Sequence, residues 1–294
     1  MTHEGDLSLL GNLKRADKRI GLLAMSGGAR GIVGGAHMTA FNDEKLQDNA
    51  TVLFGISVGA WQMLYGACGR AVVGNSIIRE ECCTSAYMSR SLPRLVQGTT
   101  VDVGLVAATA RSGPKKVNLD EVYACPADIW MGVTDDETSR WEMVDAKTAQ
   151  PDPIGVAHAS SAMVVVYRQP VYVNSRRKID GVSNPLPARE VIEKWNLDGL
   201  IVFPNRKESL KPWLGRDVLE EVTMHLLPRR HRANGRGRHA KLNESLDYLR
   251  EGKTPYLIMW PEIELHMFER CPDVLRAAEL FEYQRMKELL KRAV

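Results

Sequence analysis

The segment TVLFGISVGAWQMLYGAC, residues 51–68, indicates a buried strand that turns sharply into a buried helix. It lies within an uncharged run from Asn49 to Gly69, close to the length that spans a membrane. The four glycines of that run favour a strand, a tight turn and a helix instead. We therefore expect a strand over residues 51–56 and a helix over residues 58–68.

Other apolar runs extend this pattern. We expect strands at residues 20–25, 128–133, 140–144, 171–173, 178–179, 200–203 and 256–260. Helices are expected at residues 32–41, 154–163 and 274–292, the last with inward positions Leu275, Ala278, Leu280, Met286 and Leu289. Because buried strands that alternate with helices favour a parallel sheet, we expect an α/β domain with a largely parallel central sheet. We place this single domain at residues 19–294, after an N-terminal tail at residues 1–18.

The composition is typical of a folded protein. Of 294 residues, 44% are apolar and 26% are charged, which argues against intrinsic disorder. The five cysteines are odd in number and include no C-x-x-C pair, so neither a zinc site nor a disulfide framework is indicated. The N-terminus lacks the basic and apolar regions of a secretory signal. We therefore expect a cytoplasmic protein, peripheral to a membrane if it binds lipid.

Ser57 lies at the centre of a G-x-S-x-G motif between the expected strand and helix. A nucleophilic serine projects from a strained strand-to-helix turn, and Gly55 and Gly59 leave room for such a turn. The following helix also directs the positive end of its dipole at the serine. The motif is common by chance, but this position predicts that Ser57 is a nucleophile.

A glycine-rich loop, Ser26-Gly27-Gly28-Ala29-Arg30-Gly31, follows the strand at residues 20–25. Glycines let backbone N–H groups approach a developing negative charge, and a helix N-terminus adds its dipole. A dinucleotide-binding loop is the alternative. However, Ser26 replaces the first glycine of that fingerprint, and no carboxylate ends a second strand about 20 residues later. The loop therefore favours an oxyanion hole.

Asp180-Gly181 is the third motif. An Asp-Gly pair is usually no more than a turn. This pair follows a short extended segment and precedes Asn184-Pro185 and Pro187, which would hold a carboxylate rigidly at a strand end. We therefore take Asp180 as a candidate catalytic carboxylate.

These three motifs, in this order, resemble those of the patatin-like phospholipase family. The segment AHASSA at residues 157–162 is also similar to a helix of that family, and the resemblance covers roughly residues 19–292. It implies a three-layer α/β/α fold. It also implies hydrolysis of lipid acyl esters, of the phospholipase A or lysophospholipase type.

The resemblance implies a catalytic dyad, in which Ser57 attacks the ester carbonyl and Asp180 accepts its proton. No cofactor or metal is expected, and no calcium-binding loop is visible. Val182 stands where the family has a small residue, and would displace Asp180 if that position required a positive φ. The oxyanion would be held by a loop of five residues, in which the arginine supports the backbone: Gly27, Gly28, Ala29, Arg30 and Gly31.

A Ser–Asp–His esterase of broader substrate range is an alternative. The chain order allows four histidines after Asp180 as the third member: His225, His231, His239 and His266. None of these histidines follows a recognisable strand end. A non-catalytic lipid-binding or nucleic-acid-binding protein is the other alternative.

The formal net charge of +3 conceals a local concentration of basic residues. Residues 228–241 are expected to form a basic loop that carries no acid, while the rest of the chain is mildly acidic. This loop lacks aromatic residues for base stacking, so contact with an anionic membrane is favoured over specific nucleic-acid binding. The basic residues are Arg229, Arg230, Arg232, Arg236, Arg238 and Lys241. The sequence gives no indication of the oligomeric state.

Overall fold

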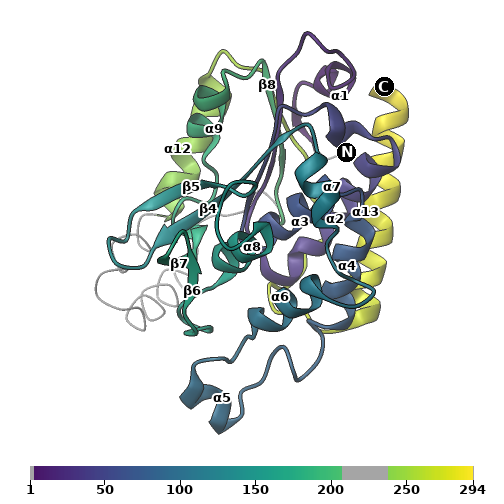
Figure 1. The fold of residues 1–294 in the computed structure, drawn as a ribbon. Helices are drawn as coiled ribbons and strands as arrows, with labels where there is room; N and C mark the ends of the chain where they lie inside the picture. Colours follow the sequence, from purple (N-terminus) through teal and green to yellow (C-terminus); the bar gives the residue numbers. More distant parts are fainter. Residues whose placement is uncertain (1–2, 207–237, 294) are drawn as a thin grey trace.

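The computed structural model describes residues 3–206 and 238–293. Its centre is a nine-stranded sheet in the order β1-β9-β8-β2-β3-β4-β7-β6, with β5 paired to β4. Strands β9, β8, β2, β3 and β4 are parallel to one another, which confirms the predicted α/β class with a largely parallel sheet (Figure 1). The strands are β1 Glu4–Gly5, β2 Ile20–Ala24, β3 Val52–Ile56, β4 Asp128–Asp135, β5 Trp141–Asp145, β6 Val171–Val173, β7 Arg176–Asp180, β8 Gly199–Phe203 and β9 Tyr256–Ile258.

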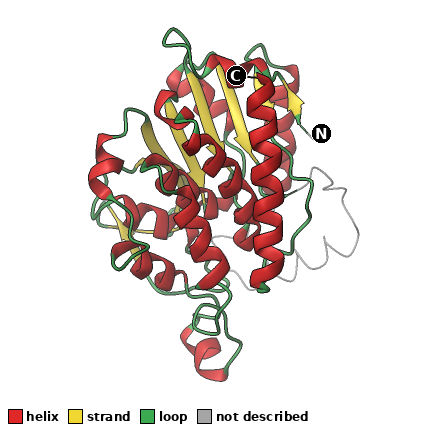
Figure 2. Cartoon of the chain, turned by 90° about the vertical axis from the view of Figure 1, so that its right-hand side faces the viewer, coloured by secondary structure: helices red, strands yellow, loops and turns green. Residues whose placement is uncertain are grey.

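Helices cover both faces of the sheet, which gives the expected three layers. One face carries α2, α3, α4 and α13, and the other carries α9 and α12 (Figures 1 and 2). The α-helices are α1 Ser8–Asn12, α2 Gly31–Asp43, α3 Val58–Ala67, α4 Ala71–Glu80, α5 Leu92–Gln97, α6 Val103–Arg111, α7 Leu119–Ala124, α8 Pro153–Ser161, α9 Ala188–Trp195, α12 Arg238–Glu251 and α13 Pro272–Ala293. Short 3₁₀ helices are η1 Gly28–Arg30, η2 Leu46–Asn49 and η3 Gly181–Ser183.

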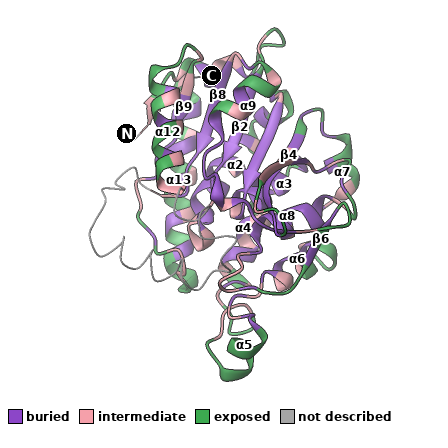
Figure 3. Cartoon of the chain, turned by 90° about the vertical axis from the view of Figure 1, so that its left-hand side faces the viewer, coloured by how far each residue is buried: buried purple, intermediate pink, exposed green. Residues whose placement is uncertain are grey.

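Strand β3 explains why its sequence is apolar throughout. Leu53 packs into the core under α2 and α3, whereas Phe54 and Ile56 pack into the core under α9 and α12. Successive side chains of a strand point to opposite faces, so a strand covered on both faces is buried along its whole length (Figure 3).

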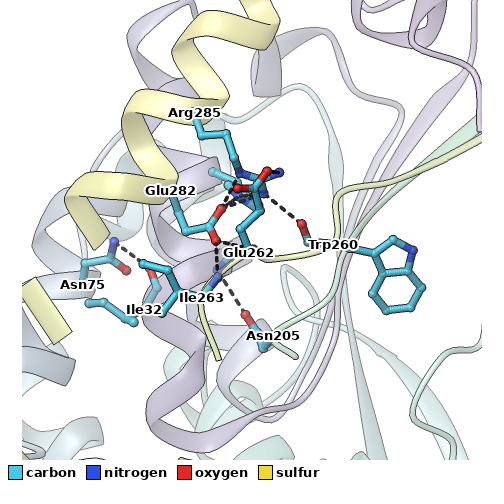
Figure 4. A network of polar contacts seen from close by, with 10 residues as sticks. Ile32, Asn75, Asn205, Trp260, Glu262, Ile263, Glu282 and Arg285 are labelled. Atoms are coloured by element: carbon cyan, nitrogen blue, oxygen red, sulfur yellow. Dashed lines mark hydrogen bonds and ion pairs between the residues drawn. The ribbon is translucent and has the colours of Figure 1, made fainter. Parts of the chain in front are cut away.

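A buried ionic network joins α13 to α2 (Figure 4). Glu282 accepts from the His37 ring nitrogen at 3.2 Å and forms an ion pair with Arg285 at 2.6 Å. Burial opposes the charge of Glu282, but these partners lower its pKa to about 2. Arg285 also donates to the carbonyl of Trp260 at 2.9 Å. The network therefore fixes α13 against the helix that leads away from the glycine-rich loop.

Three sequence expectations about the fold are wrong. Within the expected N-terminal tail at residues 1–18, the described residues from 3 onward belong to the folded body, since β1 pairs with β9 and Leu9 and Leu10 of α1 are buried. Leu280 is exposed, because the inward positions at that turn of α13 are the charged Glu282 and Arg285. The basic loop does not extend to residue 241, since residues 238–241 begin α12, with Arg238 as the first helical residue. Its earlier part lies outside the described residues.

The packing of α1 gives a first prediction. Leu10→Ala removes a fully buried side chain, so we expect a loss of about 2–5 kcal/mol in the free energy of unfolding. Leu280→Ala is the matched control, because that leucine is exposed, and it should leave the denaturation midpoint almost unchanged. Equal midpoints for both variants in chemical denaturation would contradict the packed N-terminus.

Candidate active site

Strand β4 brings Ser57 and Asp180 together, although they are far apart in sequence. β5 pairs with one edge of β4 over residues 130–134, so β3 and β7 must both pair with the other edge. β3 runs parallel to β4 and ends opposite Gly132, while β7 runs antiparallel and ends with Asp180 opposite the next residue, Val133. The two strands therefore meet end to end, and the residues at their ends are neighbours.

Ser57 has the strained backbone that a nucleophile elbow requires. Its φ is 58° and its ψ is −123°, at the junction of β3 and α3. The glycines on either side leave no room for a side chain. A Cβ at Gly55 would lie 2.3 Å from the carbonyl oxygen of Gly59, and one at Gly59 would lie 2.3 Å from that of Ala24. The turn thus needs both glycines of the motif.

The Ser57 hydroxyl donates a hydrogen bond to Asp180 Oδ2 at 2.8 Å. The other carboxylate oxygen accepts from the backbone N–H of Val182 at 2.8 Å. Val182 is absent from the residues with positive φ, so its branched side chain does not displace Asp180. Gly181 packs against the β4 backbone, where a Cβ would lie 2.2 Å from the carbonyl oxygen of Gly132. The Asp-Gly pair therefore aims the carboxylate at Ser57.

Burial raises the pKa of Asp180 to about 7, while hydrogen bonds from Ser57 and Val182 oppose the rise. The carboxyl is almost completely buried. An Asp of ordinary pKa is a weak base for a serine hydroxyl, and a pKa near neutrality makes it a stronger one that is still half ionised at pH 7. The shift of this pKa comes from tertiary burial, which the sequence alone does not reveal.

Ser160 of α8 holds the backbone of Ser57, a contact that the sequence did not reveal. The N–H of Ser57 donates to Ser160 Oγ at 2.9 Å, and the Ser160 hydroxyl donates to the carbonyl of Gly132 at 2.6 Å. This chain of hydrogen bonds ties the elbow to α8 and to β4. The resemblance of residues 157–162 to a family helix was the only signal that marked this segment.

The glycine-rich loop ends beside the dyad. Gly28 has a φ of 62°, and a Cβ there would lie 2.6 Å from the carbonyl oxygen of Met267, so only glycine fits easily. Arg30 Nε donates to the carbonyl of Gly27 at 3.1 Å, which matches its expected supporting role. The loop continues into Gly31, whose Cα lies against the Val58 side chain.

The backbone N–H groups of the loop are not equivalent. The N–H of Ala29 donates to the carbonyl of Met267 at 2.9 Å, so it is not free to bind an oxyanion, contrary to our expectation. Those of Gly27 and Gly28 donate to no acceptor among residues 3–206 and 238–293. These two groups are the remaining candidates from the loop.

Asn205, which follows β8, supports this loop from behind. It accepts from the N–H of Gly34 and from the Gln62 side chain, both at 3.1 Å, and donates to the carbonyl of Met25. Its Cβ lies where a side chain at Gly27 would be placed. Asn205 therefore connects β2, α2 and α3 behind the loop. No sequence motif pointed to it.

All three motifs line one cavity of about 190 Å³. Ser57, Asp180 and the loop residues 26–30 form part of its wall. The rest of the wall is largely apolar, with Ile77, Ile78, Met88, Val101, Val103, Val106, Met163 and Val166. Arg30, Arg206 and Arg238 also reach the cavity. An amphipathic molecule with a long apolar part fits such a lining.

The remaining sequence candidates are dispersed. His239 lines the cavity and His266 caps the N–H of Phe268, while His225 and His231 lie outside the described residues. Of the basic segment only Arg238 and Lys241 are described, both in α12; Arg229, Arg230, Arg232 and Arg236 are not.

Among the described residues, no three His, Cys, Asp or Glu side chains cluster as metal ligands would. In the same part of the chain, no helix is both long and apolar enough to cross a membrane.

No protein-family model matches this chain, and no curated protein matches it. Among the solved structures that are similar to this chain are three of low sequence identity. VipD from Legionella pneumophila is 11% identical with a TM-score of 0.47, over 94% of this chain and 67% of that one. Human GIVD cytosolic phospholipase A2, solved with a fluorophosphonate inhibitor, is 13% identical with a TM-score of 0.45, over 97% of this chain and 62% of that one. A chain in the complex of SpcU with ExoU from Pseudomonas aeruginosa is 12% identical with a TM-score of 0.35, over 78% of this chain and 53% of that one.

The raised pKa of Asp180 makes stability depend on pH. The carboxyl ionises near pH 4 in the unfolded chain but near pH 7 in the folded protein, so its contribution to stability falls as the pH rises from about 4 to about 7. Asp180→Asn removes this penalty. We expect it to raise the free energy of unfolding by up to about 4 kcal/mol at pH 8 and to have little effect at pH 4. Thermal melts at both pH values test this, and an equal shift at each would contradict it.

The role of Ser160 can be separated from general packing. Ser160→Ala leaves the Ser57 N–H and the Gly132 carbonyl without their buried partner, so we expect a loss of about 1–3 kcal/mol in stability. A serine-reactive organophosphorus probe should label Ser57 about tenfold more slowly or worse. Ser161→Ala is the control, since that hydroxyl binds Trp61 rather than Ser57, and its labelling rate should be nearly normal. Equal rates in both variants would show that Ser160 has no positioning role.

Proposed function

We propose that this protein is a serine hydrolase of lipid acyl esters, of the phospholipase A or lysophospholipase type, with a Ser57–Asp180 dyad. One observation carries the proposal. Ser57, held in a strained elbow, donates at 2.8 Å to a buried carboxyl with a pKa near 7, in the wall of a largely apolar cavity. The three motifs that resemble those of patatin-like phospholipases all line that cavity, which supports the proposal further.

In the proposed reaction, Asp180 accepts the Ser57 proton as Oγ attacks the ester carbonyl. The carbonyl oxygen becomes an oxyanion, and the N–H groups of Gly27 and Gly28 stabilise its charge together with the adjoining helix dipole. The protonated Asp180 then gives its proton to the departing alcohol, which leaves an acyl group on Ser57. A water molecule, deprotonated by Asp180, releases the fatty acid and restores the serine.

The cavity favours a lipid over a small polar ester. Its aliphatic wall suits an acyl chain, and the ester carbonyl would lie beside Ser57. Arg30, Arg206 and Arg238 add positive charge near the dyad, and the charge of Arg238 weakly opposes the rise that burial causes in the pKa of Asp180. An ester with an anionic phosphate beside the scissile bond fits this combination.

A Ser–Asp–His mechanism is less well supported. In such a triad a histidine lies between the serine and the carboxylate, whereas Asp180 binds the Ser57 hydroxyl directly. His239 is the candidate that lines the same cavity. Turnover that survives His239→Ala would favour the dyad over a triad through that histidine.

The proposal is tested by hydrolysis of a panel of phospholipids, lysophospholipids and short-chain esters. Ser57→Ala should reduce turnover by about 10⁴-fold or more, because it removes the nucleophile. Turnover by the unmodified protein should rise with pH through about 7 as Asp180 ionises.

Ser26→Ala is the matched control, since Ser26 lines the same cavity and its replacement leaves the dyad intact. It should still be labelled by an organophosphorus probe, and Ser57→Ala should not. A protein that hydrolyses none of the esters and takes no label would instead be a non-catalytic lipid-binding protein. Equal turnover by the wild type and Ser57→Ala would eliminate the dyad.

A further inference from the structure

Helix α5 projects from the body of the protein at the end of a loop (Figure 1). Three large apolar side chains on it are exposed: Leu92 by 74%, Leu95 by 51% and Val96 by 77%. Their spacing of three and four residues places them on one side of the helix. They form an apolar stripe that faces solvent (Figure 3), which we call the α5 stripe.

The loop that carries the α5 stripe has a definite shape. Its two limbs are joined where Met88 pairs with Val101 and where the N–H of Ser89 donates to Thr100. Arg94 holds the interior of the loop, because it donates to the carbonyls of Ala86 and Thr99 and forms an ion pair with Asp102 at 3.3 Å. The helix is thus held away from the core. Its exposed leucines therefore contribute little to the stability of the fold.

The base of this loop is part of the cavity wall. Met88 and Val101 line the cavity, as does Val166, whose carbonyl accepts from the N–H of Val101. The loop that carries the α5 stripe therefore also forms part of the wall of the cavity that holds Ser57 and Asp180.

The charge around the stripe also fits a lipid surface. No acidic residue occurs from Thr84 to Val101, and Arg90 is exposed beside the stripe. Arg168, also exposed, lies at the base, where its N–H donates to the carbonyl of Gly98. Aliphatic side chains flanked by arginines are the arrangement that enters the headgroup region of a bilayer containing anionic lipid.

We propose that the α5 stripe inserts into a phospholipid bilayer and delivers lipid from it to the cavity. This proposal rests on the proposed function only in its choice of a lipid surface as the partner. The proposal also assigns membrane contact to α5, whereas the sequence analysis assigned it to the basic segment at residues 228–241. A protein partner or a second copy of this chain would bury the same stripe, and the experiment separates these outcomes.

Binding is measured by co-sedimentation with vesicles of phosphatidylcholine and phosphatidylglycerol, with Ser57→Ala as the parent so that no lipid is consumed. Adding Leu92→Ser and Leu95→Ser should weaken binding by at least about tenfold. Leu280→Ser is the matched control, because Leu280 is an exposed leucine of α13, 55% accessible, and it should bind like the parent.

With Ser57 restored, the two-leucine variant should hydrolyse a monomeric short-chain ester normally and lose hydrolysis of vesicle lipid. Parental vesicle binding by that variant would overturn the proposal. So would a dimer, seen by light scattering, that the two substitutions disperse. An absence of hydrolysis from the wild type contradicts the proposed function but leaves the binding comparison intact, so the two failures are distinguishable.

Discussion

The site depends on the single edge of β4 that β3 and β7 share. One strand arrives parallel and the other antiparallel, so their ends face each other, and the residues there are Ser57 and Asp180. The hydrogen bond between them needs no long side chain to span a gap. Both side chains are positioned by the ends of paired strands, which place a site more precisely than loops do.

The rest of the fold maintains this junction. Ser160 connects the elbow to α8, and Asn205 connects the glycine-rich loop to the helices behind it. The ionic network of His37, Glu282 and Arg285 holds α13 against α2, which continues from that loop. These contacts thus set the positions of Ser57 and of the glycine-rich loop in the cavity wall.

Local pattern was enough to predict much of this structure. The apolar run of residues 51–56 and the G-x-S-x-G motif placed β3, its turn and α3 closely, since a strand covered on both faces has to be apolar throughout. The pairing of β1 with β9 was missed because its partners lie more than 250 residues apart and leave no local periodicity. Leu280 was placed inward because apolar residues were assumed to face the core, whereas two charged residues take that position in α13. The roles of Ser160 and Asn205, and the pKa of Asp180, arise only from tertiary contacts.

The backbone N–H of Ser57 is occupied by its hydrogen bond to Ser160. Because that N–H is already used, it is not available for the charge that would develop on the substrate in the proposed reaction. The donors proposed for that charge lie in the loop after β2, a different strand from the one that leads into Ser57. In the proposed mechanism, the nucleophile and the groups that stabilise charge therefore lie on separate segments of the chain. A change confined to the loop can silence turnover while the serine keeps its geometry, so an inactive relative could retain an intact dyad.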